Sequence, residues 1–249
     1  GMKSSTAPTL FDLRGRTALI TGSTRGIGLA LAQGLAESGA SVILNSRQQT
    51  AVDAAVAQLQ ALGLNAQGAA FDVADQASVE AAFAGFDRAG LAIDIVINNA
   101  GIQHRQPMLE VSLDDWNRVI NTNLTAAFMV GRAAARRMIE RGTGGKIINI
   151  GSLTSEAARA TVAPYTVAKG GIKMLSKAMA AEWAQHNIQA NSIGPGYILT
   201  DMNEALVNNP SFDAWVKASN PAGRWGKPDE LVGTAVFLAS AASNYINGQ

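Results

Sequence analysis

The sequence predicts an α/β protein built on one doubly wound parallel sheet, and three observations support this prediction. Apolar runs of strand length alternate with longer stretches of helical periodicity along the whole chain. These runs are almost continuously apolar, which is typical of strands buried on both faces. A glycine-rich turn, Thr21–Gly28, joins the first run to the first helical stretch. This alternation favours right-handed βαβ units around a single parallel sheet.

Each predicted strand is a short apolar run, and each predicted helix is a longer stretch with apolar residues at helical spacing. The strands are expected at Thr17–Thr21, Ser41–Asn45, Asn65–Phe71, Ile93–Asn98, Lys146–Ile150 and Ile188–Ile193. The helices between them are expected at Gly28–Ser38, Thr50–Leu62, Gln76–Arg88, Leu113–Arg141 and Ala163–Gln185.

The chain is interpreted as one domain, residues 1–249, because no linker or change of composition divides it. Residues 1–12 are expected to form a flexible N-terminal segment. After the last predicted strand, residues 201–228 are expected to form a small helical cap, followed by a helix over Asp229–Ser240. Ligands of such sheets bind beyond the carboxyl ends of the strands, so a cap in this place can cover a substrate.

Composition excludes several classes of function. Of the 249 residues, 47% are hydrophobic and 16% charged, with a net charge of +1, so no overall field recruits nucleic acid or anionic lipid. The absence of cysteine excludes disulfides, thiolate nucleophiles and thiolate-bound zinc, and no metal site is predicted. The first residues contain no apolar signal region, and the longest helical apolar run is too short to span a bilayer. A cytoplasmic protein is therefore expected.

The glycine-rich turn has the spacing G-x-x-x-G-x-G, which differs from the usual dinucleotide fingerprint G-x-G-x-x-G. Glycines here let the backbone turn tightly and approach a pyrophosphate, while the following helix supplies N–H donors. A turn without a ligand is the alternative. Because a strand precedes and a helix follows, we predict that this loop binds a cofactor through Gly22, Ser23, Thr24, Arg25, Gly26, Ile27 and Gly28.

The end of the second predicted strand indicates which dinucleotide binds. An acidic residue there would hold the ribose 2′-hydroxyl of NAD, and none is present. The segment instead contains Asn45, Ser46 and Arg47, with Arg25 as a second cation in the glycine loop. Guanidinium groups form charge-assisted bonds with a 2′-phosphate. The sequence therefore favours NADP(H) over NAD(H), with NAD(H) as a possible second cofactor.

Polar and small residues follow the third and fourth predicted strands. Asp72 and Val73 end the third strand, where a carboxylate can accept a bond from an adenine amino group. The sequence Asn98–Gly101, N-N-A-G, ends the fourth, and its small residues suit a backbone that passes close to a ribose. In the next helical stretch, Asn121 and Asn123 carry amides into an apolar region, where a buried amide requires hydrogen bonds.

Three side chains form a possible acid–base group. Ser152 follows a predicted strand, Tyr165 comes thirteen residues later, and Lys169 lies one helical turn beyond the tyrosine. Residues four apart share a helix face, so the lysine ammonium can lie beside the phenol and lower its pKa toward the working range. A surface helix pair is the alternative for this short pattern.

The joint order of these motifs resembles the short-chain dehydrogenase/reductase family: TGxxxGxG, D-V, NNAG, N-x-x-A, Ser, YxxxK and P-G at Pro195–Gly196. The resemblance covers nearly the whole chain and implies a Rossmann-like fold and a catalytic tetrad. In that tetrad Ser152 would bind the substrate oxygen, Tyr165 would exchange the proton, Lys169 would lower the tyrosine pKa and bind the nicotinamide ribose, and Asn123 would hold a relay water. The cofactor contacts implied elsewhere are Asn99, Ala100, Gly101, Pro195, Gly196, Ile198 and Thr200.

Within that family the chain is most similar to enzymes of sugar acids, on the stretches Gly101–Arg105, Ser155–Arg159, His186–Asn191, Gly196–Met202 and Pro221–Gly226. The expected reaction is hydride transfer between NADP(H) and a secondary alcohol or ketone of a small polyhydroxylated acid of the gluconate type. The substrate residues expected are Gln103, Arg105, Ser152, Glu156, Arg159 and Tyr165. His104 stands where a second arginine is expected, and the chemistry does not need it.

Two other functions stay open at this stage. A 3-oxoacyl-carrier-protein reductase would share the tetrad and would need a basic patch and a longer apolar channel. A non-catalytic NADP-binding sensor or scaffold would have no need to keep all four tetrad residues. The resemblance also implies a homo-oligomer, a tetramer or a dimer, and a further strand with a V-D-G-G segment beyond the position of Gln249.

Overall fold

The computed structural model describes residues 6–153 and 158–249. Within them, a six-stranded parallel sheet has the order β3-β2-β1-β4-β5-β6. Its strands are β1 (Thr17–Ile20), β2 (Ser41–Ser46), β3 (Ala66–Ala70), β4 (Ile95–Asn98), β5 (Gly145–Ile150) and β6 (Ile188–Ile193). The strand order reverses between β1 and β4, and an open α/β sheet of this kind binds its ligand at that point.

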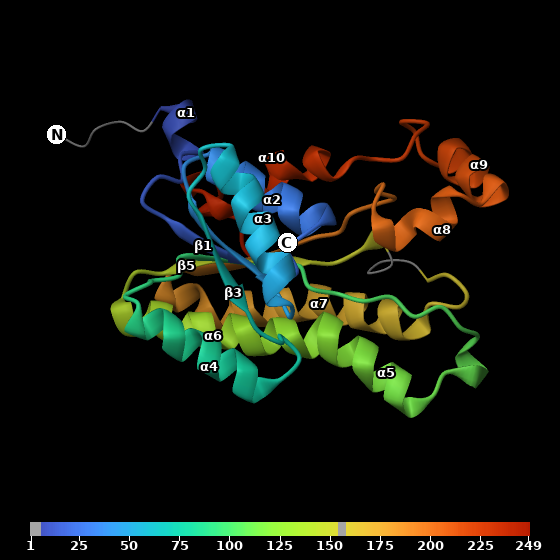
Figure 1. Ribbon diagram of the computed structural model, residues 1–249, viewed down its shortest axis with the longest axis horizontal. Coiled ribbons are helices and arrows are strands. Elements are labelled where there is room, and N and C mark those ends of the chain that lie inside the picture. The colour runs from blue at the N-terminus through green and yellow to red at the C-terminus, as the bar shows by residue number, and fades with distance from the viewer. Residues whose placement is uncertain (1–5, 154–157) are drawn as a thin grey trace.

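Helices cover both faces of the sheet (Figure 1). One face carries α2 (Gly26–Glu37), α3 (Gln49–Ala61) and α10 (Val232–Ala239), and the other carries α4 (Gln76–Arg88), α5 (Leu113–Ile120), α6 (Ala126–Arg141) and α7 (Ala163–Trp183). The buried side chains divide accordingly into two apolar clusters, with neighbours in one strand pointing to opposite clusters: Leu19 faces the α4 and α6 side, while Ile20 faces α2. The double burial explains why these strands are almost continuously apolar.

The elements agree with the sequence predictions to within about two residues at most ends, and two of them differ in character. The edge strand β3 is not buried on both faces, since Gln67 and Gly68 are exposed, and among the described residues it pairs with β2 alone. The predicted helix Leu113–Arg141 is interrupted by a π-helical turn, Asn121–Thr125, between α5 and α6. Part of the segment expected to be flexible also has defined structure: Ala7–Leu10 forms the short helix α1, and the Phe11 ring lies 6.5 Å from that of Phe237.

The predicted cap consists of a 3₁₀ turn, Asp201–Asn203, and two helices, α8 (Glu204–Val207) and α9 (Pro210–Ser219), which lie at one end of the molecule (Figure 1). An aromatic cluster joins α9 to the strand ends. In it the Tyr197 ring lies 5.7 Å from each of the rings of Phe212, Trp215 and Trp225. A backbone bridge between Ile198 and Gly226 holds the two loops that supply Tyr197 and Trp225. The last described residues run beside β6, where the Gly248 amide donates to the Ala190 carbonyl at 2.8 Å.

Candidate active site

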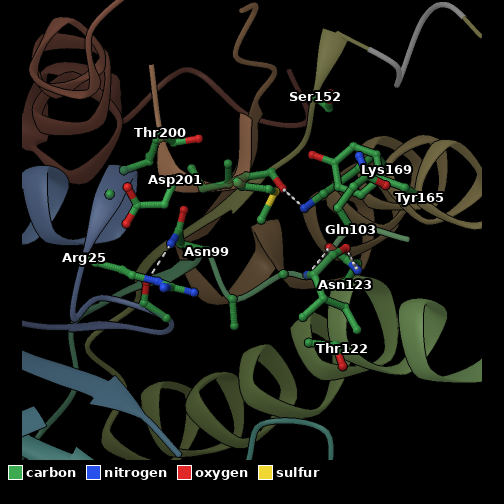
Figure 2. A pocket seen from close by; sticks show the side chains of 18 of the residues that line it. Arg25, Asn99, Gln103, Thr122, Asn123, Ser152, Tyr165, Lys169, Thr200 and Asp201 are labelled. Atoms are coloured by element: carbon green, nitrogen blue, oxygen red, sulfur yellow. Dashed lines mark hydrogen bonds between the residues drawn. The ribbon is translucent and has the colours of Figure 1, made fainter. Parts of the chain in front are cut away.

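A cleft of about 780 Å³ lies at the carboxyl ends of the strands. Residues within two positions of the end of each of the six strands line it, together with part of the cap. Predicted cofactor residues that line the cleft are Gly22, Thr24, Arg25, Gly26, Ile27, Asn45, Ser46, Arg47, Asp72, Val73, Asn99, Ala100, Gly101, Tyr165, Lys169, Pro195, Gly196, Ile198 and Thr200. The predicted substrate residues Gln103, Arg105, Ser152 and Arg159 line the same cleft, as does Asn123. Figure 2 shows Arg25 and Asn99 on one side of it and Ser152, Tyr165 and Lys169 on the other.

The glycine loop fits tightly against the N-N-A-G segment. Gly22 has φ +58°, and a Cβ at this position would lie 2.7 Å from the Ala100 Cα atom. The side-chain amide of Asn99 donates to the Gly22 carbonyl at 2.9 Å, and the Thr21 hydroxyl accepts from the backbone amides of Asn99 and Ala100 at 3.0 Å each. Only a glycine allows this approach, so the floor of the cleft depends on Gly22.

The N-terminus of α2 opens into the cleft and fits a pyrophosphate. Arg25 is its N-cap residue and makes no side-chain capping bond, and Gly26, at φ +58°, has no atom within 4 Å of where a Cβ would lie. Free N–H groups and the helix dipole make such an end a site for anions. The exposed guanidinium groups of Arg25 and Arg47 line the cleft beside it, and β2 ends without a carboxylate. This donor set fits the additional 2′-phosphate of NADP.

Two of the predicted cofactor residues have their side chains committed to the protein. The Asn45 amide donates to the carbonyls of Ala69 and Phe71 at 3.1 and 3.2 Å, and its oxygen accepts from the Gly22 amide at 3.2 Å. The buried Ser23 hydroxyl donates to the Ile20 carbonyl and accepts from the backbone N–H of Asn45. Neither Ser23 nor Gly28 lines the cleft. The hydrogen bonds of the Asn45 and Ser23 side chains therefore hold the backbone of the cofactor loop in place.

Ser152, Tyr165 and Lys169 meet at the end of β5 (Figure 2). The Tyr165 hydroxyl is hydrogen-bonded to Ser152. The Lys169 ammonium lies 5.5 Å from the centroid of the tyrosine ring and donates to the Ile150 carbonyl at 3.0 Å. The i, i+4 spacing on α7 and the strand end thus bring the three residues together as predicted.

The pKa of Tyr165 moves in the opposite direction to the one predicted. Burial raises it, while the hydrogen bond from Ser152 and the positive charges of Arg105 and Arg159 act to lower it. Burial also lowers the pKa of Lys169 to about 8. In this site the cations that act on the phenol are the two arginines, because the lysine ammonium lies over the ring face and bonds to a backbone carbonyl.

Asn123 lies in the π-helical turn, which places its buried amide under the cleft. Its nitrogen donates to the carbonyls of Val119 and Ile102 at 2.8 and 2.9 Å, and its oxygen accepts from the Ile102 amide at 3.3 Å. A Cβ on Gly101 would lie 2.5 Å from this oxygen and 3.6 Å from the Lys169 Nζ atom. Turns of this kind occur frequently at functional sites. The amide pattern of the sequence locates the residue but does not reveal the turn.

Arg105 and Arg159 approach Tyr165 from two loops. Both are partly buried, and among residues 6–153 and 158–249 neither makes an ion pair. Burial and the charge of Arg159 lower the pKa of Arg105. Gln103 belongs to the same loop as Arg105, and Figure 2 shows it above Asn123. Glu156, the remaining predicted substrate residue, lies outside the described residues.

His104 lies between Gln103 and Arg105 in the chain, and it does not line the cleft as they do. Its Nε2 atom lies 2.8 Å from the Gln106 side-chain oxygen and 3.6 Å from the Asp115 carboxylate on α5. The Gln106 amide in turn donates to the Thr161 carbonyl at 2.8 Å, and Thr161 has φ +72°, a strained value for a β-branched residue. These contacts tie the Arg105 loop to the segment before α7.

The cleft also contains residues that the sequence did not predict. They come from the helices and the cap that fold over it, and include Gln48, Arg118, Thr122, Tyr197, Asp201, Met202, Asn203 and Leu206. Local periodicity carries no signal for which loop covers a cleft. Asp201 does directly follow the predicted Thr200, and this adjacency could have identified it.

Neither a metal site nor a membrane span is found in the part of the chain that the structure describes. No three His, Cys, Asp or Glu side chains there gather as metal ligands. None of the helices in those residues has the length and apolar character needed to cross a bilayer.

The comparisons with known proteins agree with this geometry. Gluconate 5-dehydrogenase of Gluconobacter oxydans (strain 621H) is 51% identical over 242 residues, which cover 97% of this chain and 94% of that protein. The crystal structure of a gluconate 5-dehydrogenase from Burkholderia cenocepacia J2315 in complex with NADP and tartrate has 50% identity and a TM-score of 0.95, with 98% and 95% of the two chains covered. A 3-oxoacyl-(acyl-carrier-protein) reductase of Vibrio harveyi is 40% identical over 238 residues, which cover 96% of this chain and 95% of that protein.

The family pattern described as short chain dehydrogenase matches residues 16–211, which include the glycine loop, the N-N-A-G segment and the Ser152, Tyr165 and Lys169 group. With this match over most of its length and with relatives of this identity, the chain belongs to the short-chain dehydrogenase family.

Proposed function

We propose that the protein transfers a hydride reversibly between NADP(H) and the C5 position of gluconate. The oxidised product is 5-keto-D-gluconate, and each turnover releases one proton in the direction of oxidation. Relatives named for this reaction and a structural neighbour crystallised with NADP support the proposal.

The observation that carries the proposal is the pair of guanidinium groups beside Tyr165. Arg105 and Arg159 act electrostatically on the phenol, and neither has a carboxylate partner among the described residues. Partly buried cations gain most from an anionic ligand, and an arginine binds a carboxylate through two parallel hydrogen bonds. A substrate that combines a carboxylate with an oxidisable alcohol therefore fits this site.

The residues that would hold NADP(H) are the N-terminus of α2 for the pyrophosphate, Arg25 and Arg47 for the 2′-phosphate, and the N-N-A-G segment for the nicotinamide half. When bound, the nicotinamide supplies the hydride chemistry. The protein orients the substrate and excludes water, and it manages the proton.

Tyr165 is the acid and base that we assign to the substrate oxygen. Its hydroxyl faces the cleft, and Ser152 is hydrogen-bonded to it, so both hydroxyls can bind one substrate oxygen. In reduction the phenol gives its proton to the forming alkoxide; in oxidation the phenolate accepts the alcohol proton. The positive charges of Arg105 and Arg159 favour the phenolate, while the Lys169 ammonium lies over the ring face with Asn123 beside it.

The proposed reaction is tested by following NADPH absorbance with 5-keto-D-gluconate, with NADH and an acetoacetyl thioester as controls. We expect oxidation of NADPH with the keto acid alone. Turnover of the thioester in place of the keto acid would assign the protein to the acyl reductases. If no carbonyl compound were reduced although NADPH bound, the protein would be a sensor or scaffold.

The acyl reductase is the second candidate, since the Vibrio harveyi relative carries that name. The two arginines argue against it, because the interior of an acyl channel is apolar while this cleft holds two guanidinium groups beside the phenol that have no carboxylate partner among the described residues. The scaffold hypothesis gains no support, since the Ser152, Tyr165 and Lys169 group is assembled in one cleft.

We further propose that the protein is a homo-oligomer, a dimer or a tetramer, located in the cytoplasm. Large apolar side chains lie exposed beside α5 and on the adjoining α7, where Leu109 is 102%, Leu113 71% and Met174 61% exposed. Burial of such a surface contributes about 25 cal/mol per Å². Light scattering should give a multiple of the 25.9 kDa chain, and Leu113→Asp with Met174→Asp should reduce it. A wild-type protein of 25.9 kDa in solution would contradict the oligomer.

A further inference from the structure

The guanidinium of Arg159 is held on the face of an aromatic ring from the cap. Its Cζ atom lies 5.0 Å from the centroid of the Phe212 ring, at the start of α9. The Asn209 side chain caps this helix by accepting from the Phe212 backbone amide at 3.1 Å. This bond fixes the backbone from which the ring projects. The contact is the only ring or ion contact of Arg159 among the described residues.

The Phe212 ring is itself fixed by its neighbours. It packs against Tyr197 at 5.7 Å, Trp215 at 5.6 Å and Trp225 at 6.3 Å. Trp225 is buried, and its indole nitrogen donates to the Asp213 carboxylate at 2.7 Å. The ring therefore belongs to a rigid cluster that joins α9 to the strand ends beside the cleft.

The position of the Arg159 guanidinium affects the ionisation of Tyr165, the proposed acid and base. Its charge acts on Tyr165 and on Arg105, so it lies within electrostatic reach of both. Phe212 itself is not among the residues that line the cleft. Its influence on a ligand acts through its two neighbours that do line the cleft, Arg159 and Tyr197, and the Arg159→Gln background separates the two routes.

We propose that Phe212 is a positioning residue that holds the Arg159 guanidinium beside Tyr165 and so sets the preference of the site for anionic substrates. This inference rests on the proposed function, in which Arg159 receives the substrate carboxylate. The contact couples the cap to the charge of the substrate, because the ring that holds the cation belongs to the cap. Loss of the ring face leaves the arginine a long, mobile side chain with several rotamers.

The test uses binding in the dead-end complex of NADPH and gluconate, which cannot turn over. Gluconate is titrated into the NADPH complex of the wild type, Phe212→Leu, Phe212→Tyr, Arg159→Gln and the double variant. We expect Phe212→Leu to weaken gluconate binding by roughly 2- to 30-fold, the range of a cation–π contact. Phe212→Tyr keeps a ring face and should restore binding. In the Arg159→Gln background, Phe212→Leu should have no further effect.

A matched control is available on the other side of the molecule. Arg132 lies 4.5 Å from the centroid of the Phe128 ring on α6, a cation–π pair whose residues do not line the cleft. Phe128→Leu removes the same kind of contact and should leave gluconate affinity unchanged. NADPH affinity is measured first for every variant and should not change. This control separates a variant that has lost its fold from one in which only the Arg159 guanidinium is displaced.

The outcomes separate this inference from the proposed function. Equal weakening by Phe212→Leu in the wild-type and Arg159→Gln backgrounds would overturn the positioning role, as would wild-type affinity in Phe212→Leu. Gluconate that binds but is never oxidised with NADP⁺ would overturn the proposed reaction and leave the positioning role standing. A wild-type NADPH complex that does not bind gluconate would overturn both.

Discussion

Tyr165 carries out its proton transfer in surroundings that oppose its ionisation. Burial raises its pKa, and only a hydrogen bond and two arginine charges act in the other direction. The balance depends on groups from three different segments: Ser152 after β5, Arg105 in the loop after β4, and Arg159 before α7. The sequence predicts the closeness of Ser152, Tyr165 and Lys169, because a single helical turn and a single strand end bring them together. The approach of Arg159 to Phe212 could not, because 53 residues separate them and local periodicity says nothing about such contacts.

Replacement of Tyr165 by phenylalanine removes the hydroxyl and leaves the ring in place. We expect kcat to fall by about 10²- to 10⁴-fold, the usual contribution of a positioned acid or base. NADPH binding, measured by fluorescence, should be kept. Tyr245→Phe is the matched control, since Tyr245 is fully exposed and does not line the cleft. Full activity of the Tyr165 variant would contradict the proton-transfer role.

Replacement of Arg47 by alanine removes one of the two cations assigned to the 2′-phosphate. We expect the Kd for NADPH to rise roughly 10- to 100-fold, as for loss of a hydrogen bond to a charged group. The Kd for NADH, which lacks this phosphate, should stay the same. Arg88→Ala changes an exposed arginine of α4 that does not line the cleft and should affect neither cofactor. Equal weakening of both cofactors would show that Arg47 does not recognise the phosphate.

At the scale of elements, the strands and most helices follow from periodicity alone, while the departures have physical causes. The π-helical turn at Asn121–Thr125 has side chains that also suit a regular helix, so its backbone geometry could not be predicted from the sequence. Asn45, predicted as a cofactor residue, lines the cleft, and its side-chain amide also donates to the carbonyls of Ala69, in β3, and Phe71, directly after it. The sequence shows the same polar residue at a strand end whether its side chain contacts a ligand or a neighbouring loop, so it does not distinguish the two.

Two glycines of the cofactor loop have the same φ, +58°, and different neighbours, which makes them a matched pair. Alanine at Gly26 meets open space and should cost only the backbone strain of about 1–2 kcal/mol. Alanine at Gly22 should cost more, because its Cβ would lie 2.7 Å from the Ala100 Cα atom. Thermal unfolding should therefore show the larger fall in Tm for Gly22→Ala, together with a weaker affinity for NADPH. Equal falls in Tm would contradict the role assigned to the contact with Ala100.

At the scale of the whole molecule, the single doubly wound parallel sheet and the place of the cleft follow from the sequence, since parallel βαβ units leave few alternatives and ligands bind beyond the carboxyl ends of the strands. The far end of the sheet was not predicted to hold anything unusual. There Lys146, on β5, is buried and donates to the Ser243 hydroxyl and the Asn244 side-chain oxygen at 3.2 and 2.8 Å. A lysine in an otherwise apolar strand pattern gives no sign of whether its ammonium reaches solvent or a polar partner in a distant turn.

Burial lowers the pKa of Lys146 from 10.5 to about 8 in the folded protein. Between these values the unfolded chain binds more protons than the folded one, so this group makes the free energy of unfolding rise with pH from about 8 to 10.5. The variant Lys146→Met lacks the group. Urea denaturation at pH 7, 8.5 and 10 should show the stability difference shifting in favour of the wild type as the pH rises. A difference that stays constant would contradict the lowered pKa.

The aromatic cluster of the cap gives the protein an optical property. Two of its four tryptophans, Trp215 and Trp225, lie in that cluster beside the cleft. Tryptophan emits ultraviolet light in the region where reduced nicotinamide absorbs, so a bound reduced cofactor should quench these two indoles by energy transfer. The loss of emission then reports, without any attached dye, that a reduced cofactor is bound beside the cap.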